Sequence, residues 1–306
     1  MTRAYLAFTD TGLALAKRLA AALPGSVARC GRDGVSLAEW TSAQFVHSDA
    51  LIFVGAAGIA VRAIAPHCKS KTADPAVVVV DECGRFAVPI LSGHLGGAND
   101  LARAIAAVCG AVPVITTATD AHGIFAVDEW AKHQNCTVLE PERIKLVSGK
   151  LLAGQPVYYR ADFPVTGTVP AGLCPAEAPE KADFALTLCP AGQALHLVPR
   201  IGVLGIGCKR GTSAETLEAA FAAFCARYGF AVQAVTAAAS IDLKQNEPGL
   251  LAFCQARGWP VRFYSAAQLR SVPGQFTPSP FVQSVTGVDN VCERAAVLDA
   301  GGSLFY

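Results

Sequence analysis

Apolar runs and helical stripes alternate along the first third of the chain. Five apolar runs predict strands, at Ala4–Thr9, Ala50–Gly55, Ala76–Val80, Phe86–Leu91 and Val112–Thr117. Between them, apolar residues recur at helical spacing over residues 13–23, 36–47 and 97–108, which predicts helices there. Continuous apolar runs are typical of strands covered on both faces. The alternation therefore predicts an α/β layer with a mostly parallel sheet.

The pattern changes between Gln134 and Arg200, where Pro and Gly become frequent and the helical period is lost. This region is either a small insert domain or an elaborate connection. Afterwards the alternation resumes, with strands predicted at Ile201–Ile206, near Val232–Val235 and at Val261–Tyr264, and with helices predicted over Thr212–Tyr228, from Pro248, and over Asn290–Leu298. Thr212 and Glu215 have capping-box spacing, which places the start of the first of these helices.

The predicted fold is two α/β domains with mostly parallel sheets and a small middle insert. We expect an N-terminal domain over 1–134, a variable middle region over 135–198 and a C-terminal domain over 199–306.

Composition narrows the class of protein. The most apolar stretch, Ala50–Val61, is shorter than the ~20 residues of a spanning helix, and the N-terminus shows no export signal, so we expect a cytoplasmic protein without a membrane segment. Eleven cysteines without a C-x-x-C pair suggest neither a disulfide framework nor a zinc site, and predict reduced, mostly buried thiols. The net charge of +1 argues against a nucleic-acid partner and leaves an anionic small molecule open.

Two strand ends in the first half could carry chemistry. The turn after Phe86–Leu91 places His94 among glycines, where it could transfer a proton near neutral pH. Thr117 and Asp120 follow the next strand, and would face His94 if the two strands are parallel neighbours. The alternative is a tight structural turn around His94 and a hydroxyl-rich turn that ends with Asp128 as a helix cap. The spacing favours neither explanation.

Four further stretches combine glycine, charge and hydroxyl groups. The turn at 55–62 could cradle an anion beside Arg62, and the turn at 205–213 places Lys209 and Arg210 at a helix start. Neither turn has a complete dinucleotide or phosphate-loop pattern, so ATP hydrolysis is not indicated. The stretches at 240–247 and 286–294 mix acid, base and amide near helix starts, for which a solvated face or a capping network is the ordinary explanation.

Taken together, these stretches resemble the cobalt-precorrin 5A hydrolase family of oxygen-independent vitamin B12 synthesis. The first half carries the resemblance at residues 49–62, 74–82, 91–99 and 116–120, and the second half carries it at 205–212, 240–244 and 286–296. The resemblance spans nearly the whole chain, although 135–198 matches the middle region of the family by position only.

The resemblance implies a hydrolase that opens the lactone of a cobalt tetrapyrrole and releases acetaldehyde, giving cobalt-precorrin 5B. Such a reaction needs a base, an oxyanion donor and anchors for carboxylates. We assign His94 as the general base and Asp120 or Thr117 as its orienting group. Gly96 and Gly97 are assigned as oxyanion donors through their backbone N–H groups.

Five cations are predicted to hold the carboxylates at the rim of the substrate: Arg62, Lys209, Arg210, Lys244 and Arg294. The matching motifs add further substrate-binding candidates, namely Gly58, Asn99, Ser240, Asp242, Thr286 and Asn290. Because the cobalt belongs to the substrate, the resemblance implies neither a metal site nor a cofactor of the protein. It leaves room for a homodimer.

Two alternatives come from other functional classes. A non-catalytic corrinoid carrier would bind the pigment tightly without forming an aldehyde, and it is favoured by the existence of the C-terminal domain type on its own. An enzyme acting on a nucleotide would be stabilised by that nucleotide rather than by a corrinoid. The incomplete phosphate-binding patterns disfavour the second alternative.

Overall fold

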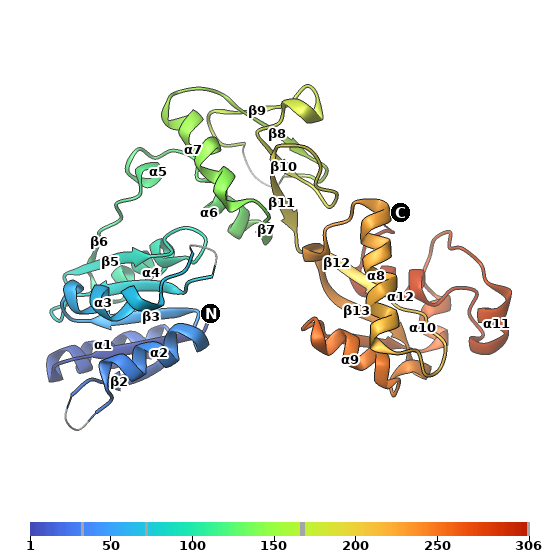
Figure 1. Ribbon diagram of the computed structural model, residues 1–306, viewed down its shortest axis with the longest axis horizontal. Helices are drawn as coiled ribbons and strands as arrows, with labels where there is room; N and C mark the ends of the chain where they lie inside the picture. Colours follow the sequence, from blue (N-terminus) through green and yellow to red (C-terminus); the bar gives the residue numbers. More distant parts are fainter. Residues whose placement is uncertain (32–33, 71–72, 166–168, 305–306) are drawn as a thin grey trace. The chain divides into compact units, whose positions relative to one another are not determined.

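The computed structural model describes residues 1–31, 34–70, 73–165 and 169–304. The chain forms two compact units (Figure 1). One unit contains Met1–His133, Pro141–Pro156 and Pro170–Gly172; the other contains the described parts of Gln134–Glu140, Val157–Val169 and Leu173–Tyr306. The first boundary falls near the predicted one at 134, whereas the middle region is shared between the two units. Within the described residues, no helix is long and apolar enough to cross a membrane.

A six-stranded sheet with the order β2-β1-β3-β4-β5-β6 forms the N-terminal unit. Its strands are β1 (Arg3–Ala7), β2 (Ser26–Arg29), β3 (Ala50–Val54), β4 (Ala76–Val80), β5 (Phe86–Leu91) and β6 (Val112–Pro113). All neighbours are parallel except β4 and β5, which are antiparallel. The pair β5-β6 therefore runs against the other four strands.

Helices cover both faces of this sheet. Helices α1 (Asp10–Ala22) and α4 (Ala98–Cys109) pack on one face, and α2 (Leu37–His47) and α3 (Ala57–Ile64) pack on the other. Alternate residues of β4 enter the two cores, with Val78 on one side and Val77 on the other, both fully buried. The two-sided burial predicted for β3 and β4 is confirmed.

Two strand predictions needed correction. β5 was expected to be buried, but it is mostly half-buried and its first residue, Phe86, is exposed. β6 was expected to continue to Thr117, but it ends at Pro113 because the chain leaves the sheet edge there. From β6 the chain continues into two short helices, α5 (Ala118–Ala121) and α6 (Val127–His133).

The middle region contains a five-stranded sheet, in the order β7-β11-β10-β8-β9. Its strands are β7 (Cys136–Val138), β8 (Val157–Ala161), β9 (Leu173–Pro175), β10 (Phe184–Leu186) and β11 (Leu195–Pro199). The helix α7 (Ile144–Leu152) belongs to the N-terminal unit instead. Of the two explanations for this region, the sheet favours the small domain.

A parallel three-stranded sheet, β12 (Gly202–Gly205), β13 (Val235–Ile241) and β14 (Val261–Tyr264), organises the C-terminal part. Helices α8 (Ala214–Tyr228) and α9 (Pro248–Ala256) cover one face, and α12 (Cys292–Ala300) covers the other. Two smaller helices, α10 (Ala266–Arg270) and α11 (Pro280–Thr286), lie between β14 and α12 in sequence. Three mostly parallel sheets, of which the first and the last are covered by helices, confirm the predicted α/β class.

Three local predictions about this part and the thiols were wrong. α8 is capped by Ser213, whose Oγ accepts the N–H of Thr216, rather than by Thr212. The strand expected near Val232 begins at Val235, after a 3₁₀ turn. The cysteines are free, but Cys254 is the single buried cysteine among them. Most of the others are half-buried.

Candidate active site

A tight turn between β5 and α4 presents His94. Ser92 adopts a left-handed backbone conformation (φ 55°), and its Oγ donates to the carbonyl of Asp74 at 2.9 Å. A left-handed serine is strained, so this buried hydrogen bond helps to hold it. Gly96 must be glycine, because a Cβ there would overlap the Ser92 side chain. The turn therefore fixes the direction in which His94 leaves the sheet.

The strands before and after this turn explain how distant residues meet. β5 and β6 are parallel neighbours, with Phe86 opposite Val112 and Ala87 opposite Pro113. The segments after these two strands leave the same edge of the sheet. Thr117 caps α5 and Asp120 lies within it, so both come beside His94. The predicted proximity of His94, Thr117 and Asp120 is confirmed.

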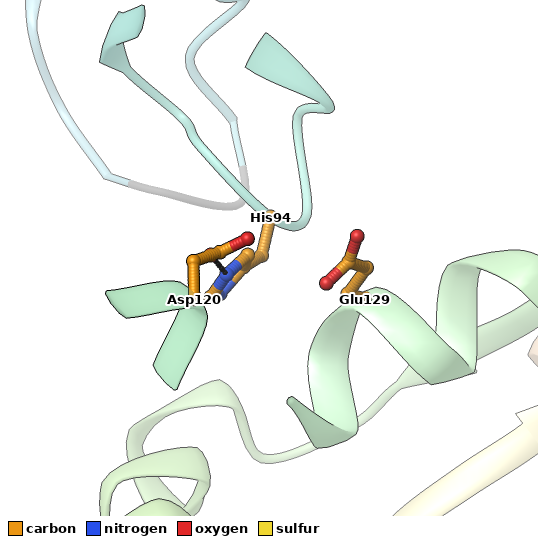
Figure 2. Close-up of side chains that lie close together, drawn as sticks. All are labelled: His94, Asp120 and Glu129. Atoms are coloured by element: carbon orange, nitrogen blue, oxygen red, sulfur yellow. Dashed lines mark hydrogen bonds and ion pairs between the residues drawn. The ribbon is translucent and has the colours of Figure 1, made fainter. Parts of the chain in front are cut away.

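His94 lies between two carboxylates. Its Nε2 is 2.7 Å from Oδ2 of Asp120, and its Nδ1 is 3.3 Å from Oδ1 of Asp128 on α6. Figure 2 shows the imidazole and Asp120 side by side, with Glu129 of α6 opposite them. The side chains of His94, Asp120 and Asp128 are 12%, 11% and 9% exposed, so the cluster is enclosed but not sealed.

This environment raises the pKa of His94 to about 9. The hydrogen bond to Asp128 contributes most; burial opposes it, and the hydrogen bond to Asp120 adds to it. An imidazole with that pKa is ~1% neutral at pH 7. In this conformation His94 is therefore a proton donor, and the general-base assignment requires that it first lose a proton.

Asp120 is held by four side chains. Its Oδ2 accepts from Thr117 Oγ1, from Asn99 Nδ2 at 3.1 Å and from His94, and its Oδ1 accepts from Arg103. Burial alone would raise the pKa of Asp120, but the hydrogen bonds from Thr117, His94 and Arg103 outweigh it and lower the pKa. Asp120 remains ionised and firmly oriented, which suits the predicted orienting role. Asn99, predicted to bind substrate, instead supports Asp120.

A rim of alternating charges surrounds the cluster. Arg103 also contacts Asp100 at 3.1 Å and Glu129 at 3.4 Å, and Lys132 lies 3.4 Å from Asp100. Donor atoms of one histidine and two carboxylates, His94, Asp120 and Glu129, lie within 4.8 Å of one another, a set that could attract a divalent cation. The guanidinium of Arg103 already bridges both carboxylates, and so fills the cationic position.

Gly97 does not offer its N–H as the oxyanion donor that the sequence predicted. That N–H donates to the carbonyl of His94 at 3.0 Å, closing the turn. Gly97 has φ 83°, and a Cβ would collide with the ammonium of Lys132. The left-handed backbone favours glycine here, and because its N–H is already occupied, the oxyanion assignment falls to Gly96 alone.

Gly58 does not share an edge of the sheet with His94. It follows β3, whose carboxyl end lies beside Val80, whereas the carboxyl end of β5 lies beside Val77 at the other end of β4. The antiparallel reversal between β4 and β5 causes this separation. Gly58 and Arg62 are exposed on α3, so their predicted role in holding an anion stays a prediction, at a different edge of the sheet from His94.

The C-terminal unit places its candidates at one sheet edge. The segments after β12 and β13, which are parallel neighbours, carry Lys209 and Arg210 on one side and Asp242 and Lys244 on the other. Lys209 and Arg210 are exposed. Lys244 is 3.1 Å from Glu247, whose other oxygen accepts the Gly211 N–H at 2.5 Å. A carboxylate of the chain itself thus occupies this anion position.

Three other predicted ligands of the C-terminal unit, Ser240, Thr286 and Asn290, make hydrogen bonds inside the protein. Ser240 is fully buried and donates to the carbonyl of Ile206 at 2.6 Å. Thr286 donates to the carbonyl of Val282, and Asn290 accepts the N–H of Glu293 and donates to a backbone carbonyl.

Arg294 forms a hub. It contacts both oxygens of Asp289, donates to the carbonyls of Leu269 and Val272 and stacks 4.3 Å from the ring centre of Phe276. Its donors are therefore committed, and the capping-network explanation holds for 286–294.

Comparisons with known proteins show the family of the chain. The family model described as Cobalamin synthesis G N-terminal matches residues 39–120, and Cobalamin synthesis G C-terminus matches 202–306. Cobalt-precorrin-5A hydrolase of Salmonella typhimurium is 35% identical over 98% of this chain and 92% of its own length. The chain belongs to the cobalt-precorrin-5A hydrolase family. The family member of Priestia megaterium is 34% identical over 82% of this chain and 72% of that protein.

One relative is shorter. Protein CobE of a Sinorhizobium species is 36% identical over 116 residues, which are 37% of this chain and 75% of that protein. Within the cobalt-precorrin-5A hydrolase family, the N-terminal model covers His94, Thr117 and Asp120 but ends before α6. The residues that α6 adds to the cluster therefore lie beyond the matched segment.

Sequence reasoning missed three members of the cluster: Arg103, Asp128 and Glu129. Asp128 was considered only as a helix cap. The i,i+3 spacing of Asp100 and Arg103 signalled an ion pair on α4, but nothing in the sequence indicated that Arg103 also reaches Asp120. These contacts depend on how α4, α5 and α6 converge.

Proposed function

We propose that this protein hydrolyses the lactone of cobalt-precorrin 5A and releases acetaldehyde, giving cobalt-precorrin 5B. The observation that carries this proposal is the 35% identity to a protein named cobalt-precorrin-5A hydrolase, over 98% of the chain. An identity of this extent includes both family domains and the His94 turn. The geometry around His94 supports the proposal by supplying a transferable proton in an enclosed site.

The reaction has two proton transfers that one imidazole can serve in sequence. Water attacks the lactone carbonyl and loses one proton to solvent, the carbon-oxygen bond of the lactone breaks to leave a carboxyl group, and the departing alkoxide is protonated by the imidazolium of His94. The neutral imidazole then removes the same proton from the new hydroxyl group. The carbon-carbon bond breaks, its electron pair passes to the macrocycle and acetaldehyde departs. This order starts from the protonated His94 that the pKa of about 9 requires, and it replaces the assignment of a resting general base.

Asp120 and Thr117 take the supporting roles. The Thr117 hydroxyl holds the carboxylate that faces Nε2, so this carboxylate stays in place while Nε2 exchanges its proton. The N–H of Gly96 remains our proposed oxyanion donor. Arg62 in the N-terminal unit, and Lys209 and Arg210 in the C-terminal unit, are exposed cations; each of them, like Asp242, stays a predicted substrate ligand.

We propose that the protein uses no metal or cofactor of its own, because Arg103 supplies the positive charge between Asp120 and Glu129. The cobalt is part of the substrate. The cytoplasmic location, the absence of a nucleic-acid partner and a homodimeric state stay predictions.

A corrinoid carrier is the second candidate. It is favoured by the similarity to Protein CobE, which is short enough to correspond to about one domain of this chain. A carrier would bind the lactone intermediate without changing it, so product formation separates the two functions.

The test is anaerobic incubation of the purified protein with the cobalt lactone intermediate, followed by measurement of acetaldehyde with a coupled alcohol dehydrogenase. We expect stoichiometric aldehyde from the wild type and a loss of ~100-fold or more in His94→Gln, the usual range for removing an acid-base group. His122→Gln is the matched control, because His122 is exposed two residues beyond Asp120. Pigment binding without aldehyde from the wild type would establish the carrier instead.

A further inference from the structure

The two carboxylates beside His94 differ in how much they depend on it. Asp120 approaches Nε2 from α5, and its Oδ2 also accepts from Thr117 and from Asn99. Because its other oxygen accepts from Arg103, Asp120 keeps three donors when Nε2 turns to another acceptor. The proton on Nε2 can therefore be handed to a substrate oxygen at little cost to Asp120.

Asp128 approaches the other nitrogen, Nδ1, from α6. Its side chain is 9% exposed, so the Nδ1–H has few alternatives in solvent. A buried N–H that loses its acceptor costs ~1–3 kcal/mol, which favours keeping this pair closed throughout a reaction. The imidazole is thus held through Nδ1, and Nε2 is the nitrogen that is left to exchange a proton.

We propose that Asp128 is the positioning residue of His94: its carboxylate anchors Nδ1 and so makes Nε2 the nitrogen that exchanges a proton with the substrate. Asp128 does not touch the reacting atoms. It acts through the histidine, as the orienting acid does in other proton-transfer pairs. The catalytic half of this inference rests on the proposed hydrolase function, and the structural half does not.

The other charged groups around the ring come from three helices. α4 contributes Asp100 and Arg103, α5 contributes Asp120, and α6 contributes Glu129 and Lys132 besides Asp128. Glu129 and Asp100 are each paired with Arg103, and Asp100 also with Lys132. Removing the charge of Asp128 therefore leaves His94 with Asp120 as its one directly bonded acid among the described residues.

The first experiment observes the ring itself. Protein labelled with ¹⁵N at histidine is titrated by NMR, and His94 is assigned from the spectrum of His94→Gln. We expect a midpoint near 9 in the wild type and a midpoint at least one pH unit lower in Asp128→Asn, with the tautomer signals of Nδ1 and Nε2 redistributed. Asp128→Glu should return the midpoint toward the wild-type value.

Glu129→Gln is the matched control. This substitution removes one negative charge from the same helix, close to the imidazole. Among the described residues, the ion pair of Glu129 is with Arg103, so no hydrogen bond or ion pair of His94 is broken. We expect its midpoint to fall less than half as far as that of Asp128→Asn. Equal shifts in the two variants would show that the helix acts as a general field and would overturn the positioning role.

The second experiment follows acetaldehyde release against pH. The alkaline limb of kcat should move from near pH 9 toward the ordinary histidine range in Asp128→Asn, with KM changed less than twofold. If the pKa falls to ~6.5, the protonated fraction at pH 8 drops by ~30-fold, and at pH 6 the rate should return to within ~2-fold of the wild type. A uniform loss at every pH, or a loss confined to KM, contradicts the proposal.

The NMR titration and the acetaldehyde assay test the positioning role and the hydrolase function separately. If the NMR midpoint moves as expected but the wild type forms no aldehyde, the positioning role stands and the hydrolase function is wrong. If aldehyde forms and the midpoint of Asp128→Asn stays near 9, the positioning role is wrong. Asp128→Ser serves as a second uncharged variant if the asparagine variant fails to fold.

Discussion

Loss of the proton from His94 should make the N-terminal unit less stable in alkaline solution. The folded protein binds this proton more tightly than the unfolded chain, because the pKa is raised from 6.5 to about 9. A raised folded pKa contributes stability that is fully present below pH 6.5 and is lost as the pH rises through 9. The difference of about 2.5 between the two pKa values corresponds to ~3 kcal/mol of unfolding free energy.

The assay is urea unfolding of the wild type and of His94→Gln at pH 6.0 and at pH 9.5, in a Trp259→Phe background. The two remaining tryptophans, Trp40 and Trp130, both lie in the N-terminal unit, so their fluorescence reports that unit. We expect the wild type to exceed the variant in stability at pH 6.0, and this difference to shrink by ~3 kcal/mol at pH 9.5.

Comparison with the variant removes the contribution of groups that titrate equally in both proteins, the cysteine thiols included. A difference between wild type and variant that changes by less than ~1 kcal/mol across this range would refute the reasoning. It would mean that the two carboxylates do not hold a charged imidazole.

Two further predictions concern the C-terminal unit. Gly205→Ala should destabilise this unit by more than ~3 kcal/mol, because the added Cβ overlaps the carbonyl oxygen of Cys292. Gly149→Ala, at an exposed position of α7 in the N-terminal unit with open space around it, is the comparison and should gain up to ~1 kcal/mol; thermal melting of both variants tests this, and equal melting temperatures would contradict it. Arg294→Lys should cost ~2 kcal/mol in urea unfolding by breaking the paired contact with Asp289, and should leave KM for the lactone intermediate unchanged; a raised KM at unchanged stability would restore its role as a substrate ligand.

Much of the site can be predicted from the sequence because it depends on strand order. His94 and Asp120 each come after an apolar run, and the segments after two parallel neighbouring strands leave from one edge of the sheet. The rule could not place Gly58 relative to His94, because the sequence pattern carries no sign that β5 reverses relative to β4. An apolar run shows burial, but its direction in a sheet depends on which neighbour it pairs with.

The protonation state of His94 cannot be predicted from the sequence. Proton affinity depends on distances of a few ångströms between side chains, and Asp128 arrives at Nδ1 from α6, which comes after two further helices in the chain. Likewise, the sequence predicted that Arg294 binds a substrate carboxylate. The structure shows that its guanidinium already donates hydrogen bonds inside the protein.

The sequence by itself determined the α/β class, the family and the proximity of His94, Thr117 and Asp120, since these depend on hydrophobic period and local motif. The tertiary structure alone decided which charges are paired inside the protein and which remain for a substrate. The physical reason is that pairing depends on the convergence of helices in space, which no local pattern of residues encodes.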